Sequence, residues 1–147
     1  FFKEVTVGPW KEITFNEWCE EQITGLNPDL QRRIWKNLGG WPINYGKINP
    51  KARDLADHVD KVADIPKRQL LDDFGLNILI ENGHLVLLEE LYEENLAEMI
   101  ADKIEMGVEA VEPILQWGKQ IGIFLYEPSS EIWRLDPFIT SQLKRHF

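Results

Sequence analysis

The chain has 147 residues, of which 44% are hydrophobic and 11% aromatic, so it is long and apolar enough to bury the core of one folded domain. Its single cysteine, Cys19, excludes an internal disulfide and favours a reducing, cytoplasmic setting. No segment approaches the roughly 18 uncharged apolar residues of a membrane span, and the N-terminus lacks the pattern of a signal peptide. We therefore expect a soluble protein without a membrane partner. The start at Phe1-Phe2 rather than at Met predicts a fragment of a longer chain, a processed product or a chain trimmed to its ordered part.

The negative charge is concentrated in one segment. The formal net charge is −9, and residues 81–112 contain ten acidic residues against one basic residue, Lys103. All other residues together contain fifteen acids and fifteen bases, so they are electrically balanced. An acidic segment of this kind repels phosphate and attracts cations or a basic partner.

The first two predicted elements are a strand and a helix. Residues 1–7 are rich in β-forming residues and predict a short strand. Thr14 followed by Glu17 fits a capping box, which opens a helix that ends at Gly25. The apolar face of this helix consists of Phe15, Trp18, Cys19 and Ile23.

Two more helices are predicted before residue 66, separated by a loop. Asn27 followed by Pro28 is typical of a helix start, and the helix runs to Gly39-Gly40. Residues 41–48 are expected to form a loop. The third helix begins at Asn49-Pro50, and its apolar residues recur at helical spacing: Ala52, Leu55, Ala56, Val59, Val62 and Ala63.

The segment 76–88 allows two interpretations. Asn82-Gly83 fits the turn of a β-hairpin, but it also fits the end of a helix that starts at about Lys67 and is followed by another helix from His84. We favour the helical interpretation, because an isolated hairpin between helices is marginally stable. Residues 88–106 are then expected to form one helix that ends at Gly107, with Leu88, Leu91, Tyr92, Met99, Ile100 and Ile104 on one face.

The C-terminal third has the pattern of a winged helix. A helix is expected over residues 111–120, followed by strands over 121–126 and 131–135, and a last helix begins at Asp136-Pro137. Trp133 and Phe124 are expected to fasten this hairpin to the helical part of the domain.

The same region resembles a known family. The run from Ile114 to Tyr126, with Gly118 before its β-forming residues, is followed by Trp133-Arg134-Leu135-Asp136-Pro137. Residues 111–147 are thereby similar to the winged-helix-like segment in the COR domains of Roco-type GTPases, which place a glycine before a β-run and a Leu-Asp-Pro-like step after it. The resemblance implies local architecture and no catalytic or nucleotide-binding residue.

The predicted fold class is mainly α: a compact helical domain of six or seven short helices with a small C-terminal, winged-helix-like β-hairpin. One domain over residues 1–147 is favoured. The alternative is a subdivision into a helical body, residues 1–107, and a winged-helix-like segment, residues 108–147.

The leading functional hypothesis is a non-enzymatic protein-interaction module, a regulatory subunit of a larger assembly. It would dock a basic protein partner through an acidic helix over residues 89–105. The residues expected to form its acidic face are Glu90, Glu94, Glu98, Asp102 and Glu105.

The alternative hypothesis is a component of nucleic-acid machinery. It would either imitate nucleic-acid phosphates with the acidic segment or contact a single strand through basic and aromatic residues: Arg32, Arg33, Lys36, Lys51, Trp41 and Tyr45. Duplex DNA is not favoured, because Glu109 and Glu112 begin the helix that a winged helix would place in the major groove.

No motif supports catalysis or a cofactor. Glu81 and His84 have the spacing of a di-iron ligand pair, but a second pair is missing and Asn82-Gly83 interrupts the helix. Cys19 and three histidines form no recognisable nucleophile motif, and the glycines do not have the spacing of a phosphate-binding loop. We therefore expect no enzyme activity, cofactor or metal.

Overall fold

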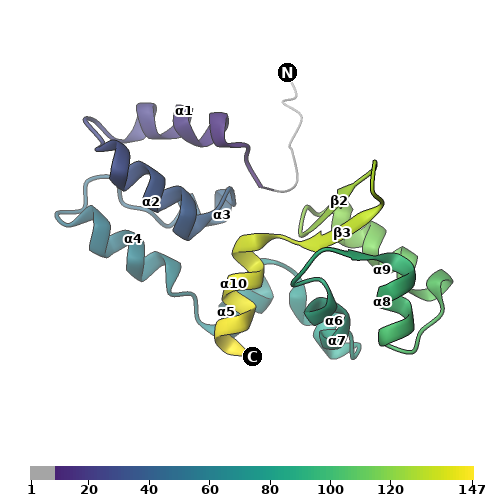
Figure 1. Cartoon of the computed structure of the whole chain (residues 1–147). Helices are drawn as coiled ribbons and strands as arrows, with labels where there is room; N and C mark the ends of the chain where they lie inside the picture. Colours follow the sequence, from purple (N-terminus) through teal and green to yellow (C-terminus); the bar gives the residue numbers. More distant parts are fainter. Residues whose placement is uncertain (1–8) are drawn as a thin grey trace, which may run out of the picture. The chain divides into compact units, whose positions relative to one another are not determined.

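The computed structural model describes residues 9–147, and it is mainly helical with a small antiparallel sheet (Figure 1). This confirms the predicted fold class. The expected strand over residues 1–7 lies outside the described residues. The chain divides into two compact units, residues 9–69 and residues 70–147, and the alternative boundary at residue 107 lies inside the second unit. The described part contains ten helices rather than six or seven, because two of the expected long helices are interrupted and a short helix forms within the expected loop 41–48.

The unit of residues 9–69 contains α1 (Glu12–Gln22), α2 (Pro28–Leu38), α3 (Pro42–Tyr45) and α4 (Leu55–Ala63). The start signal of α2 works as expected, because the Asn27 side chain accepts a hydrogen bond from the Asp29 backbone N–H at 2.7 Å. Two other predicted starts are wrong. Lys11 is the N-cap of α1, which places Thr14 inside the helix, and Asp54 rather than Asn49 caps α4.

Aromatic and aliphatic side chains from all four helices form the core of this unit: Phe15, Cys19, Ile34, Leu38, Tyr45, Ile48 and Val59. The predicted apolar face of α1 is confirmed, since Phe15, Cys19 and Ile23 are buried and Trp18 packs against the core. Residues 41–48 are not an open loop, because α3 carries Tyr45 into the core, where its ring stacks on Trp10 at a centroid distance of 5.0 Å.

The unit of residues 70–147 contains most of α5 (Lys67–Asp73), followed by α6 (Leu76–Glu81), α7 (Leu85–Glu90), α8 (Ala97–Lys103), α9 (Val108–Gln120) and α10 (Pro137–His146). The favoured helical interpretation of residues 76–88 is therefore confirmed. The helix expected from Lys67 is divided at Gly75, which has a left-handed backbone with φ of 69°. After this break, α6 buries Leu76 and Leu79 and leaves Ile78 exposed.

Three short strands form the sheet of this unit: β1 (Asn95–Leu96), β2 (Phe124–Glu127) and β3 (Ile132–Leu135). Their order is β1-β3-β2, with both pairs antiparallel, so β3 is the central strand. The predicted helix, hairpin and final helix are confirmed, and Asp136 caps α10 by accepting a hydrogen bond from Ile139 N–H at 3.1 Å. The strand β1 was not predicted.

The single helix expected over residues 88–106 is wrong. The chain leaves the helical path after Glu90, passes through a turn, pairs with β3 at Asn95 and Leu96, and only then enters α8. A continuous helix that buried Leu88 and Leu91 would also have buried Asn95 and Glu98, which lie at the following core-facing positions. The break instead lets α8 bury its own apolar stripe, Ala97, Ile100 and Ala101.

Phe124 fastens the hairpin to α9, as expected, and Trp133 is buried in the same unit. Trp133 and Phe124 are each 2% exposed. The ring of Phe124 lies against Gly118 of α9, where a methyl group would overlap the ring, so a glycine is required for this close approach. Trp133 contacts Tyr126 of the neighbouring strand at a ring centroid distance of 4.5 Å.

We predict that Trp133→Ala lowers the free energy of unfolding by about 3–5 kcal/mol, because it removes a buried aromatic side chain and leaves a cavity. Urea unfolding followed by circular dichroism would measure this loss. The matched control is Leu125→Ala, on the adjacent strand, because Leu125 is 40% exposed and its truncation should cost less than about 1 kcal/mol. Equal losses for the two variants would contradict the packing described here.

A second prediction concerns alkaline pH. Burial raises the pKa of the Cys19 thiol from 9.0 to about 11, and burial together with the nearby Cys19 raises the pKa of Tyr45 above its usual range. Groups whose pKa is raised by folding stabilise the protein fully below their unfolded pKa, and this contribution is lost as the pH rises. The unit of residues 9–69 should therefore lose stability between about pH 9 and pH 11.

Urea unfolding at several pH values, with Cys19→Ala and Tyr45→Phe as variants, would measure this dependence. Each variant should be less stable than the parent chain at pH 8, yet lose less additional stability by pH 11. An unchanged pH dependence in the double variant would show that other groups are responsible.

Candidate functional site

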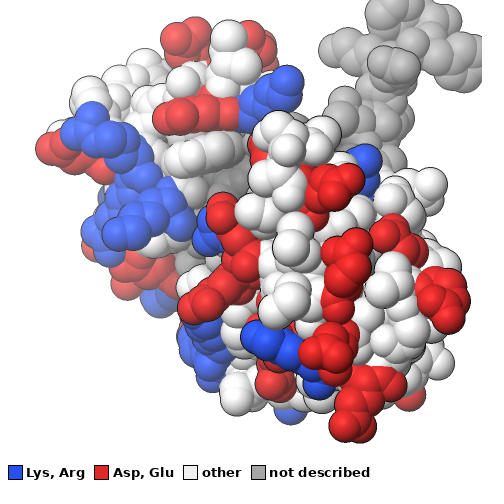
Figure 2. All heavy atoms as spheres, turned by 45° about the vertical axis from the view of Figure 1, so that its right-hand side comes forward, with Lys and Arg blue, Asp and Glu red and all other residues white. Residues whose placement is uncertain are grey.

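The two units differ strongly in net charge. Residues 70–147 contain fifteen acids and five bases, a net charge of −10, whereas residues 9–69 contain nine acids and ten bases, a net charge of +1. Figure 2 shows acidic side chains spread over one face of the unit of residues 70–147, with few basic side chains among them. A site on this unit is therefore surrounded by a negative field.

The break between α7 and α8 creates a hollow of about 340 Å³, which we call the acidic pocket. The end of α7, the turn after it and β1 together supply six of the eight lining residues, and α8 and α10 supply one lysine each. Its lining residues are Glu89, Glu90, Tyr92, Glu93, Glu94, Asn95, Lys103 and Lys144.

Glu90 is the most enclosed carboxylate of the pocket, with 24% of its side chain exposed. The Lys103 Nζ atom lies 3.3 Å from Glu90 Oε2, and Asn95 Nδ2 donates to the same oxygen at 3.5 Å. The ion pair is partly exposed and contributes at most about 1 kcal/mol to stability. It shows, however, that an ammonium group fits beside Glu90.

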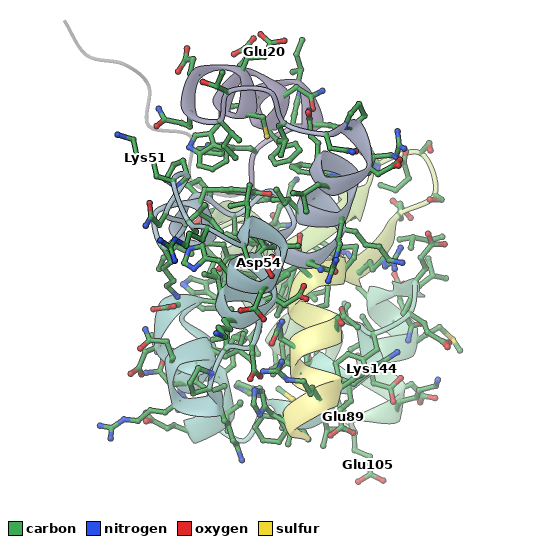
Figure 3. The ribbon with its side chains drawn as sticks, turned by 90° about the vertical axis from the view of Figure 1, so that its left-hand side faces the viewer. Glu20, Lys51, Asp54, Glu89, Glu105 and Lys144 are labelled. Carbon is green, nitrogen blue, oxygen red and sulfur yellow. The ribbon has the colours of Figure 1, made fainter. Side chains whose placement is uncertain are left out.

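Tyr92 and Lys144 also line the acidic pocket. The Lys144 Nζ atom lies 5.5 Å from the centre of the Tyr92 ring, which is a cation–π arrangement. Burial and the neighbouring charge of Glu89 raise the pKa of Tyr92 above its ordinary value. Figure 3 shows Lys144 and Glu89 on the same side of this unit.

Three carboxylates of the pocket have no cationic partner among residues 9–147. Glu89, Glu93 and Glu94 are exposed, and none of them makes an ion pair within the part of the chain that the structure describes. Glu90 differs from them because Lys103 already neutralises it. The pocket therefore retains three negative charges that a cation from outside can reach.

The chemistry of this arrangement is electrostatic. Within residues 9–147, no group of three or more His, Cys, Asp or Glu side chains is placed to hold a metal ion. Cys19 lies in the core of the unit of residues 9–69, where burial raises the pKa of its thiol, so it is not available as a thiolate nucleophile. The Nε2 atom of His58 is engaged, because it accepts a hydrogen bond from Asn49 N–H at 2.8 Å. The pocket can hold cationic groups against carboxylates.

The predicted acidic face does not form one helical stripe. Glu90 ends α7 and Glu94 lies in the turn, and both line the acidic pocket. Glu98, Asp102 and Glu105 are exposed on α8 or directly after it, and they do not line the pocket. The structure thus brings two of the five predicted residues to this site.

The structure differs from the predicted nucleic-acid-binding cluster in two respects. Trp41 and Tyr45 are 7% and 3% exposed, so neither ring is available for stacking on a base. Arg32 and Arg33 form ion pairs with Asp29 and Asp60, respectively.

The other two cluster members, Lys36 and Lys51, are exposed, and Lys51 extends away from the ribbon in Figure 3. Both lie in the unit of residues 9–69, like the two arginines. The structure therefore retains exposed basic groups there, but the two aromatic rings predicted to accompany them, Trp41 and Tyr45, are buried.

Six of the eight lining residues are not among the predicted site residues: Glu89, Tyr92, Glu93, Asn95, Lys103 and Lys144. Asn95 was the available signal: the predicted apolar face of residues 88–106 has no member between Tyr92 and Met99, where a continuous helix needs one. Lys144 had no such signal, because α10 reaches the pocket through tertiary packing.

No family model, no curated protein and no solved structure matches the chain. The resemblance of residues 111–147 to the COR domains of Roco-type GTPases therefore stays a prediction. None of the helices in residues 9–147 is long and apolar enough to cross a membrane.

Proposed function

We propose that this chain is a non-enzymatic protein-interaction module, a subunit of a larger assembly, that docks a basic partner at the acidic pocket. The observation that carries the proposal is the set of three exposed carboxylates without cationic partners, Glu89, Glu93 and Glu94, around one hollow. The initial hypothesis of an acidic helix over residues 89–105 is thereby replaced by a site on the α7–α8 turn.

The distribution of charge supports this proposal. The unit of residues 70–147 carries a net charge of −10, and such a field accelerates the approach of a basic surface and orients it before contact. The cations already present serve as examples for two ways of holding a partner's lysine or arginine. One is an ion pair like that of Lys103 with Glu90, and the other is stacking like that of Lys144 on Tyr92.

The nucleic-acid alternative has less support. Contact with a single strand would rely on Lys36 and Lys51 without the aromatic platform that Trp41 and Tyr45 were expected to supply. An acidic imitation of nucleic acid would use the same pocket as the proposed site, and its partner would be a basic nucleic-acid-binding protein.

We predict that a fluorescent peptide rich in lysine and arginine binds the chain and that Glu89→Gln, Glu93→Gln and Glu94→Gln together weaken this binding about tenfold. Each exposed ion pair contributes up to about 1 kcal/mol, and tenfold corresponds to about 1.4 kcal/mol. Fluorescence anisotropy titration would measure the affinity. Binding should also weaken with salt, because exposed charges are screened over about 8 Å at physiological ionic strength.

The matched control is a second triple glutamine variant that changes the net charge by the same amount on α1, away from the acidic pocket. Glu12, Glu17 and Glu20 are exposed on α1, and Glu20 points outward in Figure 3, so the triple glutamine variant there removes three charges without touching the pocket. This control should bind nearly as the parent chain does. Equal weakening by both triple variants would mean that the peptide senses net charge alone, and the proposed site would be wrong.

A further inference from the structure

A second hollow of about 210 Å³ lies between the turn that joins α6 to α7 and the end of α8, and we call it the α7–α8 notch. Its walls combine apolar and polar side chains, among them His84, Val86, Leu87, Ile104, Glu105 and Met106. An apolar cavity of about 150 Å³ can hold benzene. The notch therefore has room for an aliphatic side chain or a single aromatic ring.

Val86 is the exposed apolar group of the notch. It is 50% exposed, although the two residues that follow it on α7, Leu87 and Leu88, are completely buried. A single exposed valine needs no explanation on a protein surface. Here it forms part of a hollow in which Leu87 and Ile104 supply further apolar surface, so a side chain placed there would remove apolar area from water on several sides.

The notch and the acidic pocket adjoin each other. Lys103 lines both hollows. On α7, Val86 of the notch precedes Glu89 and Glu90 of the pocket by three and four residues, which places them on one face of the helix with Cβ atoms about 5–6 Å apart. One bound segment can therefore reach both hollows at the same time.

We propose that the α7–α8 notch receives an apolar side chain of the same basic partner whose lysine or arginine enters the acidic pocket. This inference rests on the proposed function and specifies what the partner carries. Charge complementarity selects a basic segment, and the notch selects an apolar residue close to its cation. The two residues would be three or four positions apart in a helical partner, or two apart in an extended one.

A phage-displayed library of random peptides, selected on the whole chain, tests this inference without assuming a spacing. The expected result is enrichment of peptides that carry lysine or arginine together with an aliphatic or aromatic residue within four positions. Replacing that apolar residue by serine in a synthetic copy of an enriched peptide should weaken binding about tenfold, measured by anisotropy.

The matching change in the protein is Val86→Gln, with Ile78→Gln as its control. Ile78 is 54% exposed on α6 and does not line the notch, so the two variants remove comparable exposed aliphatic groups from neighbouring helices. Val86→Gln should weaken binding of the enriched peptide about tenfold, and Ile78→Gln should leave it unchanged. Circular dichroism of both variants would show that they fold.

The possible failures are distinguishable. If the enriched peptides are basic but indifferent to apolar residues, and Val86→Gln binds them as well as the parent chain does, this inference is wrong while the acidic pocket remains the proposed site. Enriched peptides that are apolar but not basic would also overturn it. If no peptide is enriched, both the inference and the proposed function are wrong.

Discussion

The unit of residues 70–147 depends on the pairing of β3 with partners on both of its sides. β2 is its hairpin partner and is close in sequence, whereas β1 lies almost forty residues earlier. The Leu135 N–H also donates to the Leu91 carbonyl at 2.8 Å, so β3 holds the chain from the end of α7 to the start of α8. Because the Leu91 carbonyl and the backbone of Asn95 and Leu96 are engaged by β3, they cannot continue a helix, and the acidic segment bends into the turn that lines the pocket.

The acidic pocket is held open by packing rather than by its charges. The residues beside it, Leu88, Leu91 and Ile100, are completely buried and fix the two helices that flank the turn. The pair of Lys103 with Glu90 is too exposed to contribute much stability. Three further carboxylates can therefore stay close together without disrupting the fold, because apolar burial is larger than their mutual repulsion in water.

Features encoded by neighbouring residues were predictable from the sequence. Asn27-Pro28 and Asp136-Pro137 both open helices as expected, because an N-cap and a proline at the first helical position act within one turn. The buried stripe of α1 followed from its spacing. Features that depend on distant partners were not predictable: Asn95 and Leu96 become a strand only because β3 is present, and Tyr45 is buried only because Trp10 and Phe15 pack against it.

The dependence of the site on β3 also fixes an order of events during synthesis. The carboxylates of the pocket leave the ribosome well before residues 132–135, which hold their turn in place, and before Lys144, which completes the pocket wall. Domains fold largely as units while the chain grows, from the N-terminus onward. The unit of residues 9–69 can be complete at a stage when the acidic segment still lacks its shape, so recognition of a partner at this site would be confined to chains whose second unit has finished folding.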